Sequence, residues 1–220
     1  MSPAANDTRP FILVLAGVNG AGKSSVGGAI LEEHGLTWFN ADSYARELIA
    51  QLGVSLEEAN VRAWQHSRLQ LEAALTQGTN YAFETTLGAK TIPDLLARAV
   101  ETHKVVMIFY GLSSPEQHIE RVRLRVANGG HDIPESKIRE RWVGSRANLI
   151  RLLPHLARVQ VFDNSAQAAP GELIPDPVLV LETIEGSMVF PDRGDAHALA
   201  ETPEWARPVL QAAIESGPKK

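Results

Sequence analysis

Two continuous apolar runs dominate the pattern of hydrophobic and polar positions along the chain. They are Phe11–Ala16 and Val105–Tyr110, and Pro10 and Gly17 bound the first of them. An unbroken apolar run of about six residues is typical of a strand that is buried on both faces of a sheet. We therefore predict two central strands.

Shorter strands and helical stretches alternate with these two runs. Glycines mark several helix ends and prolines several helix starts, as their backbone preferences predict. Helices are predicted at 22–34, 42–52, 56–77, 93–100, 115–128, 134–153 and 203–216, and further strands at 36–40, 81–84, 159–163, 178–184 and 187–190. Strands that alternate with helices predict an α/β fold, a parallel sheet of about five strands with helices on both faces.

The length of 220 residues fits one domain. The regular alternation ends near position 165, and a hairpin around Glu185-Gly186 and a polar tail follow. We predict a core at 8–165, which includes a helical lid at 115–153, and a C-terminal extension at 166–220 that is not an independent domain.

Composition narrows the classes of function. A net charge of −5 argues against a general nucleic-acid binder, which usually carries a basic excess. The absence of cysteine excludes disulfides, thiolate metal sites and cysteine nucleophiles. The run Phe11–Ala16 is too short for a membrane span or a signal sequence. We therefore expect no membrane association and a cytoplasmic location.

The segment after the first apolar run satisfies the phosphate-loop pattern Gly-x-x-x-x-Gly-Lys-Ser. Glycines allow successive backbone N–H groups to point at phosphate oxygens, and the following helix adds its positive end. The lysine can contact the β- and γ-phosphates, and the serine hydroxyl can bind Mg²⁺. We predict that ATP and Mg²⁺ are bound here by Gly17, Asn19, Gly20, Ala21, Gly22, Lys23, Ser24 and Ser25, with Lys23 on the loop surface and Ser24 at the metal.

Other signatures decide which kind of phosphate-loop protein this is. The Asn-Lys-x-Asp guanine-binding motif of GTPases and the Leu-Ser-Gly-Gly-Gln-like signature of transporter ATPases do not occur. A small-molecule kinase instead needs a carboxylate at a strand end to accept the proton of the acceptor hydroxyl. Asp42 and Glu84 follow predicted strands and are candidates. Alternatively, Asp42 caps a helix that starts near Ser43, and Glu84 binds loop amides.

A block of arginines predicts a cationic lid. Arg121 and Arg125 are four residues apart and share one helical face, whereas Arg123 points away. Arg139, Arg141 and Arg146 follow on the next helix, after the hinge-like Gly129-Gly130. We predict that Arg121 and Arg125 stabilise the transferred phosphate. The alternative is a solvated basic face, in which Glu135 pairs with Arg139.

Four segments together resemble the zeta-toxin family, in particular its short chromosomal "predicted ATPase" branch. They are the phosphate loop at 17–24, Phe39-Asn40-Ala41-Asp42, Phe83-Glu84-Thr85-Thr86, and Gly129-Gly130-His131-Asp132-Ile133-Pro134. The resemblance runs from Phe11 to Ala166. It implies a P-loop kinase core of five strands that phosphorylates the sugar 3′-hydroxyl of UDP-N-acetylglucosamine with ATP, often with an antitoxin protein as partner.

The resemblance also implies roles for single residues. Lys23 would hold the phosphates, Asp42 would be the base at the sugar hydroxyl, Arg121 would match the first phosphate-stabilising arginine, and Glu84, with Thr85, would lie at the nucleotide-sugar site. One departure concerns the second lid arginine of the family, where this chain has His131; Arg125 or Arg141 could replace it.

Two other functions stay open on the sequence. One is a metabolic or resistance kinase for another hydroxyl substrate, as in the shikimate, gluconate and chloramphenicol kinases. The other is a non-enzymatic partner protein in which ATP only fixes a conformation.

Overall fold

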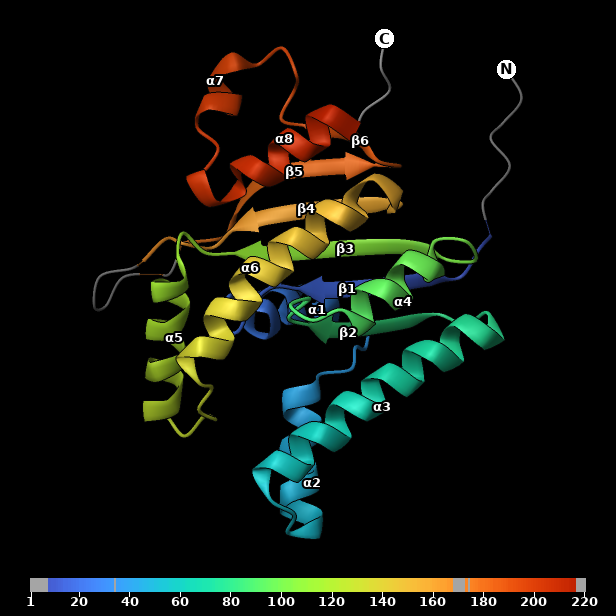
Figure 1. Ribbon diagram of the computed structural model, residues 1–220, viewed down its shortest axis with the longest axis vertical. Coiled ribbons are helices and arrows are strands. Elements are labelled where there is room, and N and C mark those ends of the chain that lie inside the picture. Colours follow the sequence, from blue (N-terminus) through green and yellow to red (C-terminus); the bar gives the residue numbers. More distant parts are fainter. Residues whose placement is uncertain (1–7, 34, 168–172, 174, 217–220) are drawn as a thin grey trace.

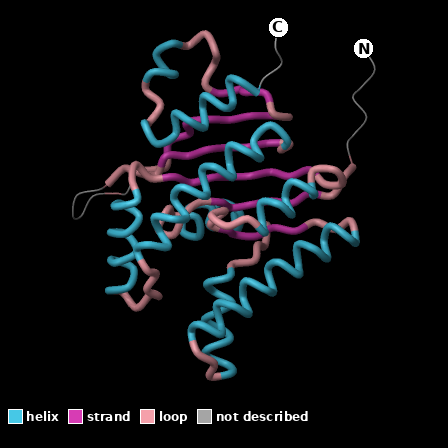
Figure 2. The backbone as a smooth tube through the Cα atoms, viewed as in Figure 1, coloured by secondary structure: helices cyan, strands magenta, loops and turns pink. Residues whose placement is uncertain are grey.

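The computed structural model describes residues 8–33, 35–167, 173 and 175–216 (Figures 1 and 2). Within these residues one sheet has six strands in the order β2-β1-β3-β4-β5-β6, of which the first four are parallel and the last two antiparallel. The strands are β1 (Phe11–Ala16), β2 (Tyr81–Thr85), β3 (Lys104–Gly111), β4 (Arg158–Asp163), β5 (Val178–Ile184) and β6 (Ser187–Phe190). The predicted α/β sheet is confirmed, with four parallel strands in place of about five, and the predicted hairpin joins it as two antiparallel strands.

The two apolar runs form the middle of the parallel part. Ile12 of β1 pairs with Tyr81 of β2 on one side and with Val105 of β3 on the other. The carboxyl ends of these parallel strands meet at one edge of the sheet, where open α/β sheets bind their ligands. The two predicted central strands therefore bring the segments that follow them together.

Helices cover both faces of the sheet, as predicted. Ile12 and Val14 of β1 belong to a core shared with helices on the near face of Figure 1, whereas Leu13 and Leu15 pack with Leu31 of α1 on the other face. These helices are α1 (Gly28–Glu33) behind the sheet and α4 (Thr91–Ala99), α6 (Glu135–Leu152) and α8 (Arg207–Ser216) in front of it, with α5 (Pro115–Ala127) beside α6. Alternation along β1 thus anchors both layers.

The helices α2 (Ala41–Leu52) and α3 (Leu56–Gln77) pack on each other and extend away from the sheet (Figure 1). Their starts are capped by side chains, since Asn40 accepts a hydrogen bond from the Ser43 amide and Ser55 one from the Glu58 amide. The predicted helices at 42–52 and 56–77 are confirmed.

Two predicted elements differ from the structure. The strand expected at 36–40 is reduced to one bridge, between Phe39 and Phe83, because the chain turns into the cap of α2 at Asn40. The helix expected at 22–34 starts with a π-helical turn, Lys23–Gly27, before α1. Its expected last residue, His34, lies outside the described residues.

The C-terminal part is more closely joined to the core than was predicted, and it contains one additional helix. The expected hairpin forms around Glu185 and Gly186, both with positive φ, and β5 pairs with β4, so it widens the main sheet. The unpredicted helix α7 (Ala196–Ala200) is capped by Asp195. The boundary between core and extension stays a prediction. Among the described residues, no helix has the length and apolar character that crossing a membrane requires.

Candidate active site

The loop between β1 and α1 has the backbone that its glycines predict. Gly17, Gly20 and Gly22 have φ values of 142°, 82° and 92°. A Cβ at Gly17 would lie 2.3 Å from the Tyr110 carbonyl oxygen, and one at Gly22 would lie 2.4 Å from the side-chain nitrogen Nδ2 of Asn164. Side chains are therefore excluded by conformation and by space.

A cavity of about 300 Å³ runs along this loop, and we call it the nucleotide cavity. Most of the predicted nucleotide-binding residues line it, namely Asn19, Gly20, Gly22, Lys23, Ser24 and Ser25. Gly17 and Ala21 do not. Gly17 donates its amide hydrogen to the Thr85 carbonyl, and the Ala21 carbonyl accepts from the Asn164 side chain, so these two residues shape the loop from behind.

Lys23 is buried, in contrast to the predicted surface position. Its side chain is only 6% exposed, and its ammonium lies 3.4 Å from Glu84 Oε1 and donates to the Val18 carbonyl. The Ser24 hydroxyl donates to Glu84 Oε2 at 2.6 Å, and the Asn40 amide donates to both Ser24 Oγ and Glu84 Oε2 at 3.0 Å. Because β2 runs parallel to β1, its carboxyl end places Glu84 beside the phosphate loop. The ion pair with Glu84 holds the Lys23 side chain in this buried position.

This network fits the Mg²⁺ ion that the phosphate loop implies. Ser24 Oγ and Glu84 Oε2 are adjacent hard oxygen ligands, the kind that Mg²⁺ prefers, and Mg²⁺ usually completes its shell with phosphate oxygens and water. No cluster of three or more histidine and carboxylate side chains within the described part of the chain could hold a metal by itself. Ser24 and Glu84 would hold a Mg²⁺ ion together with the phosphate oxygens of a bound nucleotide.

Asp42 is the second residue of α2 and faces both the loop and the lid. The helix cap is Asn40, so the alternative in which Asp42 caps this helix is wrong. The Asp42 side chain is half exposed, and its Oδ2 lies 3.6 Å from Arg125 Nη1. The carboxylate thus lies in the first turn of α2 without capping it, and it remains accessible from the cavity.

Helix α5, which belongs to the predicted lid, presents its arginines on two different faces, as predicted. Arg121 and Arg125 line the nucleotide cavity, whereas Arg123 is exposed and pairs with Glu135. Arg121 donates to the carbonyls of Asn164 and Ala166, and burial lowers its pKa. Arg125 pairs with Asp42 instead of standing free for a phosphate.

The helix α6 holds the remaining arginines of the block. Arg139 pairs with Glu116 and not with Glu135, so its predicted i,i+4 pair is wrong, because α5 packs alongside α6. Arg146 stacks on Trp142. Arg141 donates to Asn19 Oδ1 at 2.7 Å.

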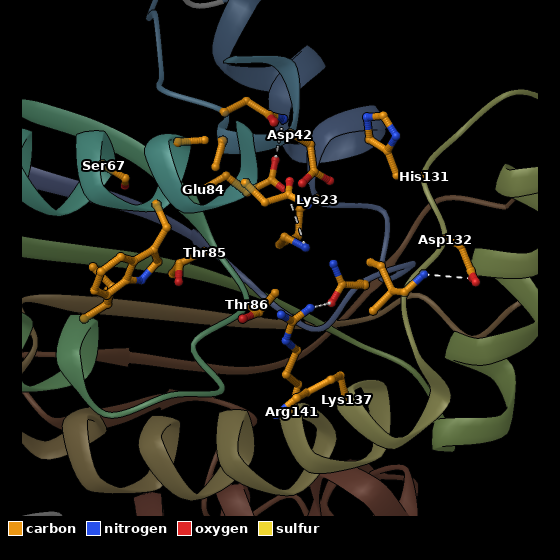
Figure 3. A pocket seen from close by; sticks show the side chains of 18 of the residues that line it. Lys23, Asp42, Ser67, Glu84, Thr85, Thr86, His131, Asp132, Lys137 and Arg141 are labelled. Carbon is orange, nitrogen blue, oxygen red and sulfur yellow. Dashed lines mark hydrogen bonds and ion pairs between the residues drawn. The ribbon is translucent and has the colours of Figure 1, made fainter. Parts of the chain in front are cut away.

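A second cavity, of about 310 Å³, opens beside the first, and we call it the acceptor cavity (Figure 3). Its walls come from α3, the end of β2, the 131–134 segment and α6, and they include Trp64, Ser67, Thr85, Thr86, His131, Lys137 and Arg141. The two cavities share Asn19, Lys23, Asp42, Glu84 and Arg125. Lys23, Asp42 and Glu84 lie close together there (Figure 3). A group bound in one cavity would therefore meet a group bound in the other at these five residues.

The start of α5 is tied to the phosphate loop through a buried histidine. His118 is 1% exposed, and its Nδ1–H donates to the Asn19 carbonyl at 2.9 Å. Burial lowers the His118 pKa to about 4, and the charges of Lys23 and Arg121 act in the same direction. The imidazole is therefore neutral at neutral pH.

We expect this histidine to make the fold acid-sensitive. The folded-state pKa lies below the ordinary histidine value of 6.5, so the unfolded chain binds the proton first. Stability that is present above pH 6.5 is therefore lost as the pH falls toward 4. At about 1.4 kcal/mol per pKa unit, the loss is at most about 3 kcal/mol. Urea unfolding of wild type and His118→Gln between pH 7 and 4 checks this. The wild type should show the steeper decline, and the exposed His155→Gln should follow the wild type; equal slopes would contradict the assignment.

Several residues of the site were not predicted from the sequence. Asn40 holds Ser24 and Glu84, and Asn164 binds the Ala21 carbonyl at 2.9 Å. Asn164 follows β4, and Trp205 Nε1 donates to the preceding Asp163. Position after a strand was a usable signal for Asn164, because strand ends meet at the ligand edge. No local signal identified Trp205.

A comparison with protein families agrees with this geometry. The family model for the AAA domain matches residues 12–142, which is more than half of the chain. The chain belongs to this AAA domain family. The matched range includes the phosphate loop, Asp42, Glu84, Arg121, Arg125 and Arg141, whereas Asn164 and Trp205 lie beyond it. No curated protein matches the chain significantly.

Solved structures show the same fold at low identity. The AvrRxo1-ORF1:-ORF2 complex with ATP is similar with a TM-score of 0.58 and 19% identity, over 83% of this chain and 61% of that chain. The same complex with sulphate ions aligns over 98% of this chain and 78% of that chain, at 18% identity and a TM-score of 0.58. The PezAT chromosomal toxin-antitoxin system of Streptococcus pneumoniae has a TM-score of 0.52 and 15% identity, over 98% and 88%. The fold is that of a P-loop kinase.

Proposed function

We propose that the protein is an ATP-dependent small-molecule kinase of zeta-toxin type, which transfers the γ-phosphate to a sugar hydroxyl. The observation that carries this proposal is the meeting of two cavities at Lys23, Asp42 and Glu84. A protein that only binds ATP needs one cavity, whereas a kinase needs a second one that opens onto the γ-phosphate position.

The residues at this junction have the chemistry that phosphoryl transfer needs. The loop amides and Lys23 would bind the phosphates of ATP, and Arg121 would add a cation at the far side of the loop. Asp42 would accept the proton of the acceptor hydroxyl as its oxygen attacks the γ-phosphorus. Ser24 and Glu84 would hold Mg²⁺, which neutralises phosphate charge when bound. The bond between the γ-phosphorus and the β,γ-bridging oxygen breaks, and its electron pair stays on that oxygen in the leaving ADP.

We propose UDP-N-acetylglucosamine as the first acceptor to test, on the zeta-toxin resemblance of the sequence. The toxin-antitoxin system among the similar structures supports this choice and also an antitoxin-like protein partner for this chain. Thr85 and Glu84 line the acceptor cavity, which agrees with the positions that the resemblance implies for the nucleotide sugar.

The test is incubation of the purified protein with ATP, Mg²⁺ and a panel of UDP-sugars and other hydroxyl compounds, followed by mass spectrometry. A gain of one phosphate on UDP-N-acetylglucosamine is the expected result. A gain on another member would support a metabolic or resistance kinase. Tight ATP binding with no gain on any member would favour a nucleotide-dependent partner protein.

Two of the three arginines of α5, Arg121 and Arg123, offer a matched comparison. Arg121→Ala is expected to lower kcat about 10²-fold or more and ATP affinity only modestly, because the cation would act on charge that develops during transfer. Arg123→Ala removes the same charge from the same helix, but this exposed residue pairs only with Glu135 and should change little. Steady-state kinetics of both variants check this. Equal effects would remove Arg121 from the mechanism.

A further inference from the structure

The middle of α6 lies unusually close to the turn that follows β2. A Cβ at Gly144 would lie 2.4 Å from the Gly88 carbonyl oxygen, and one at Gly88 would lie 2.8 Å from Arg141 Cγ. The Asn148 amide donates to the carbonyls of Leu87 and Ala89 at 2.8 and 3.0 Å. Helix and turn are thus locked together, so the side chains of this part of α6 have fixed positions relative to the end of β2.

This docking places Arg141 in the wall of the acceptor cavity, in contact with Asn19 of the junction. Its Nη1 donates to Asn19 Oδ1 at 2.7 Å, and the charge of Asp42 acts on it. Figure 3 shows Arg141 reaching from α6 toward the region of Lys23 and Asp42. Arg141 therefore stands across the junction from the lysine of the phosphate loop.

Arg141 forms no ion pair with the described residues, and neither do Arg121 and Arg146. Those two arginines donate to backbone carbonyls, whereas Arg141 donates to the side chain of Asn19. By contrast, Arg123, Arg125 and Arg139 each lie within 4 Å of a carboxylate. Burial lowers the pKa of Arg141, and the charges of Asp42 and Glu140 act in the opposite direction without either carboxylate lying in ion-pair contact. A half-buried guanidinium in this state is a binding site for an anion.

We propose that Arg141 is a catalytic residue that contacts the phosphoryl group during its transfer. This inference rests on the proposed kinase function. The bond from the acceptor oxygen to the γ-phosphorus forms, the bond to the β,γ-bridging oxygen breaks, the hydroxyl proton passes to Asp42, and Arg141 stays protonated throughout. Its guanidinium binds the equatorial oxygens from the side opposite Lys23, and Asn19 orients it. Of the two arginines that the sequence offered as replacements for the second lid arginine, Arg125 pairs with Asp42.

The experiment measures nucleotide binding and needs no acceptor. Isothermal titration calorimetry compares the affinity for Mg·ADP with that for Mg·ADP plus beryllium fluoride, which mimics the γ-phosphoryl group. We expect beryllium fluoride to tighten binding to the wild type, and Arg141→Ala to lose about tenfold or more of that gain, as for a charge-assisted hydrogen bond. Arg141→Lys keeps the charge but loses the two-pronged hydrogen-bond geometry of the guanidinium, so it should lose part of the gain in affinity.

Arg139→Ala is the control, because it removes one positive charge from the same helix at an exposed position paired with Glu116. It should keep the full gain. An unchanged gain in Arg141→Ala, or no gain in the wild type, would overturn the role of Arg141. Failure of the kinase proposal has a different signature, since a beryllium fluoride gain that depends on Arg141 would then occur without transfer to any acceptor.

Discussion

Replacement of Lys23 by alanine is expected to abolish phosphoryl transfer. The ammonium is the only loop cation at the junction of the two cavities, and it would contact the transferred group directly. Transfer from ATP, followed by mass spectrometry or by ADP release, should fall to the level without enzyme.

The same variant must stay folded for this result to count. Because Lys23 is buried against Glu84, some loss of stability is expected, of about 1–3 kcal/mol, although Ser24 and Asn40 still donate to that carboxylate. Circular dichroism and thermal unfolding check the fold. Lys104→Ala, at the amino end of β3 and thus at the opposite end of the sheet, removes the same charge and should keep its activity. Near-normal turnover of Lys23→Ala in a folded protein would disprove the assignment of the phosphate loop.

Replacement of Asp42 by asparagine is expected to lower kcat by roughly 10²–10⁴. Asparagine keeps the shape of the side chain but cannot accept the hydroxyl proton, so the effect falls on turnover. ATP affinity should stay nearly unchanged, because the loop and Lys23 would bind the phosphates. Steady-state kinetics and calorimetry with ATP separate the two effects.

Asp94→Asn provides the control for the ion pair. Asp94 is an exposed carboxylate on α4 that pairs with Arg151, much as Asp42 pairs with Arg125, but it lies outside both cavities. Its replacement should leave kcat within about twofold, as for an exposed pair. Equal activity of Asp42→Asn and wild type would exclude the role as base.

Much of the fold and part of the site could be predicted because their signals are local. The strands β1 and β3 appear as unbroken apolar runs, and the phosphate loop follows from glycines and a lysine within eight residues. The opposed faces of Arg121 and Arg123 follow from helical geometry alone. The alternative role of Asp42 as a helix cap was also a local question: Asn40 and Asp42 are both good caps, and the pattern could not rank them.

What only the tertiary structure decided depends on segments that are far apart in the chain. The contact of Arg141 with Asn19 joins residues 122 positions apart, and that of Asn164 with Ala21 joins residues 143 apart. The contact of Arg141 depends on how closely α6 approaches Gly88. The contact of Asn164 depends on the order of the strands, because β3 brings the ends of β4 and β1 to the same edge of the sheet. The sequence by itself determined the phosphate loop, the parallel strands and the helical faces, because each is set by residues a few positions apart. The partners of Lys23, Arg125 and Arg141 were decided by packing, since a long charged side chain can reach several carboxylates or amides and only the docked helices select one.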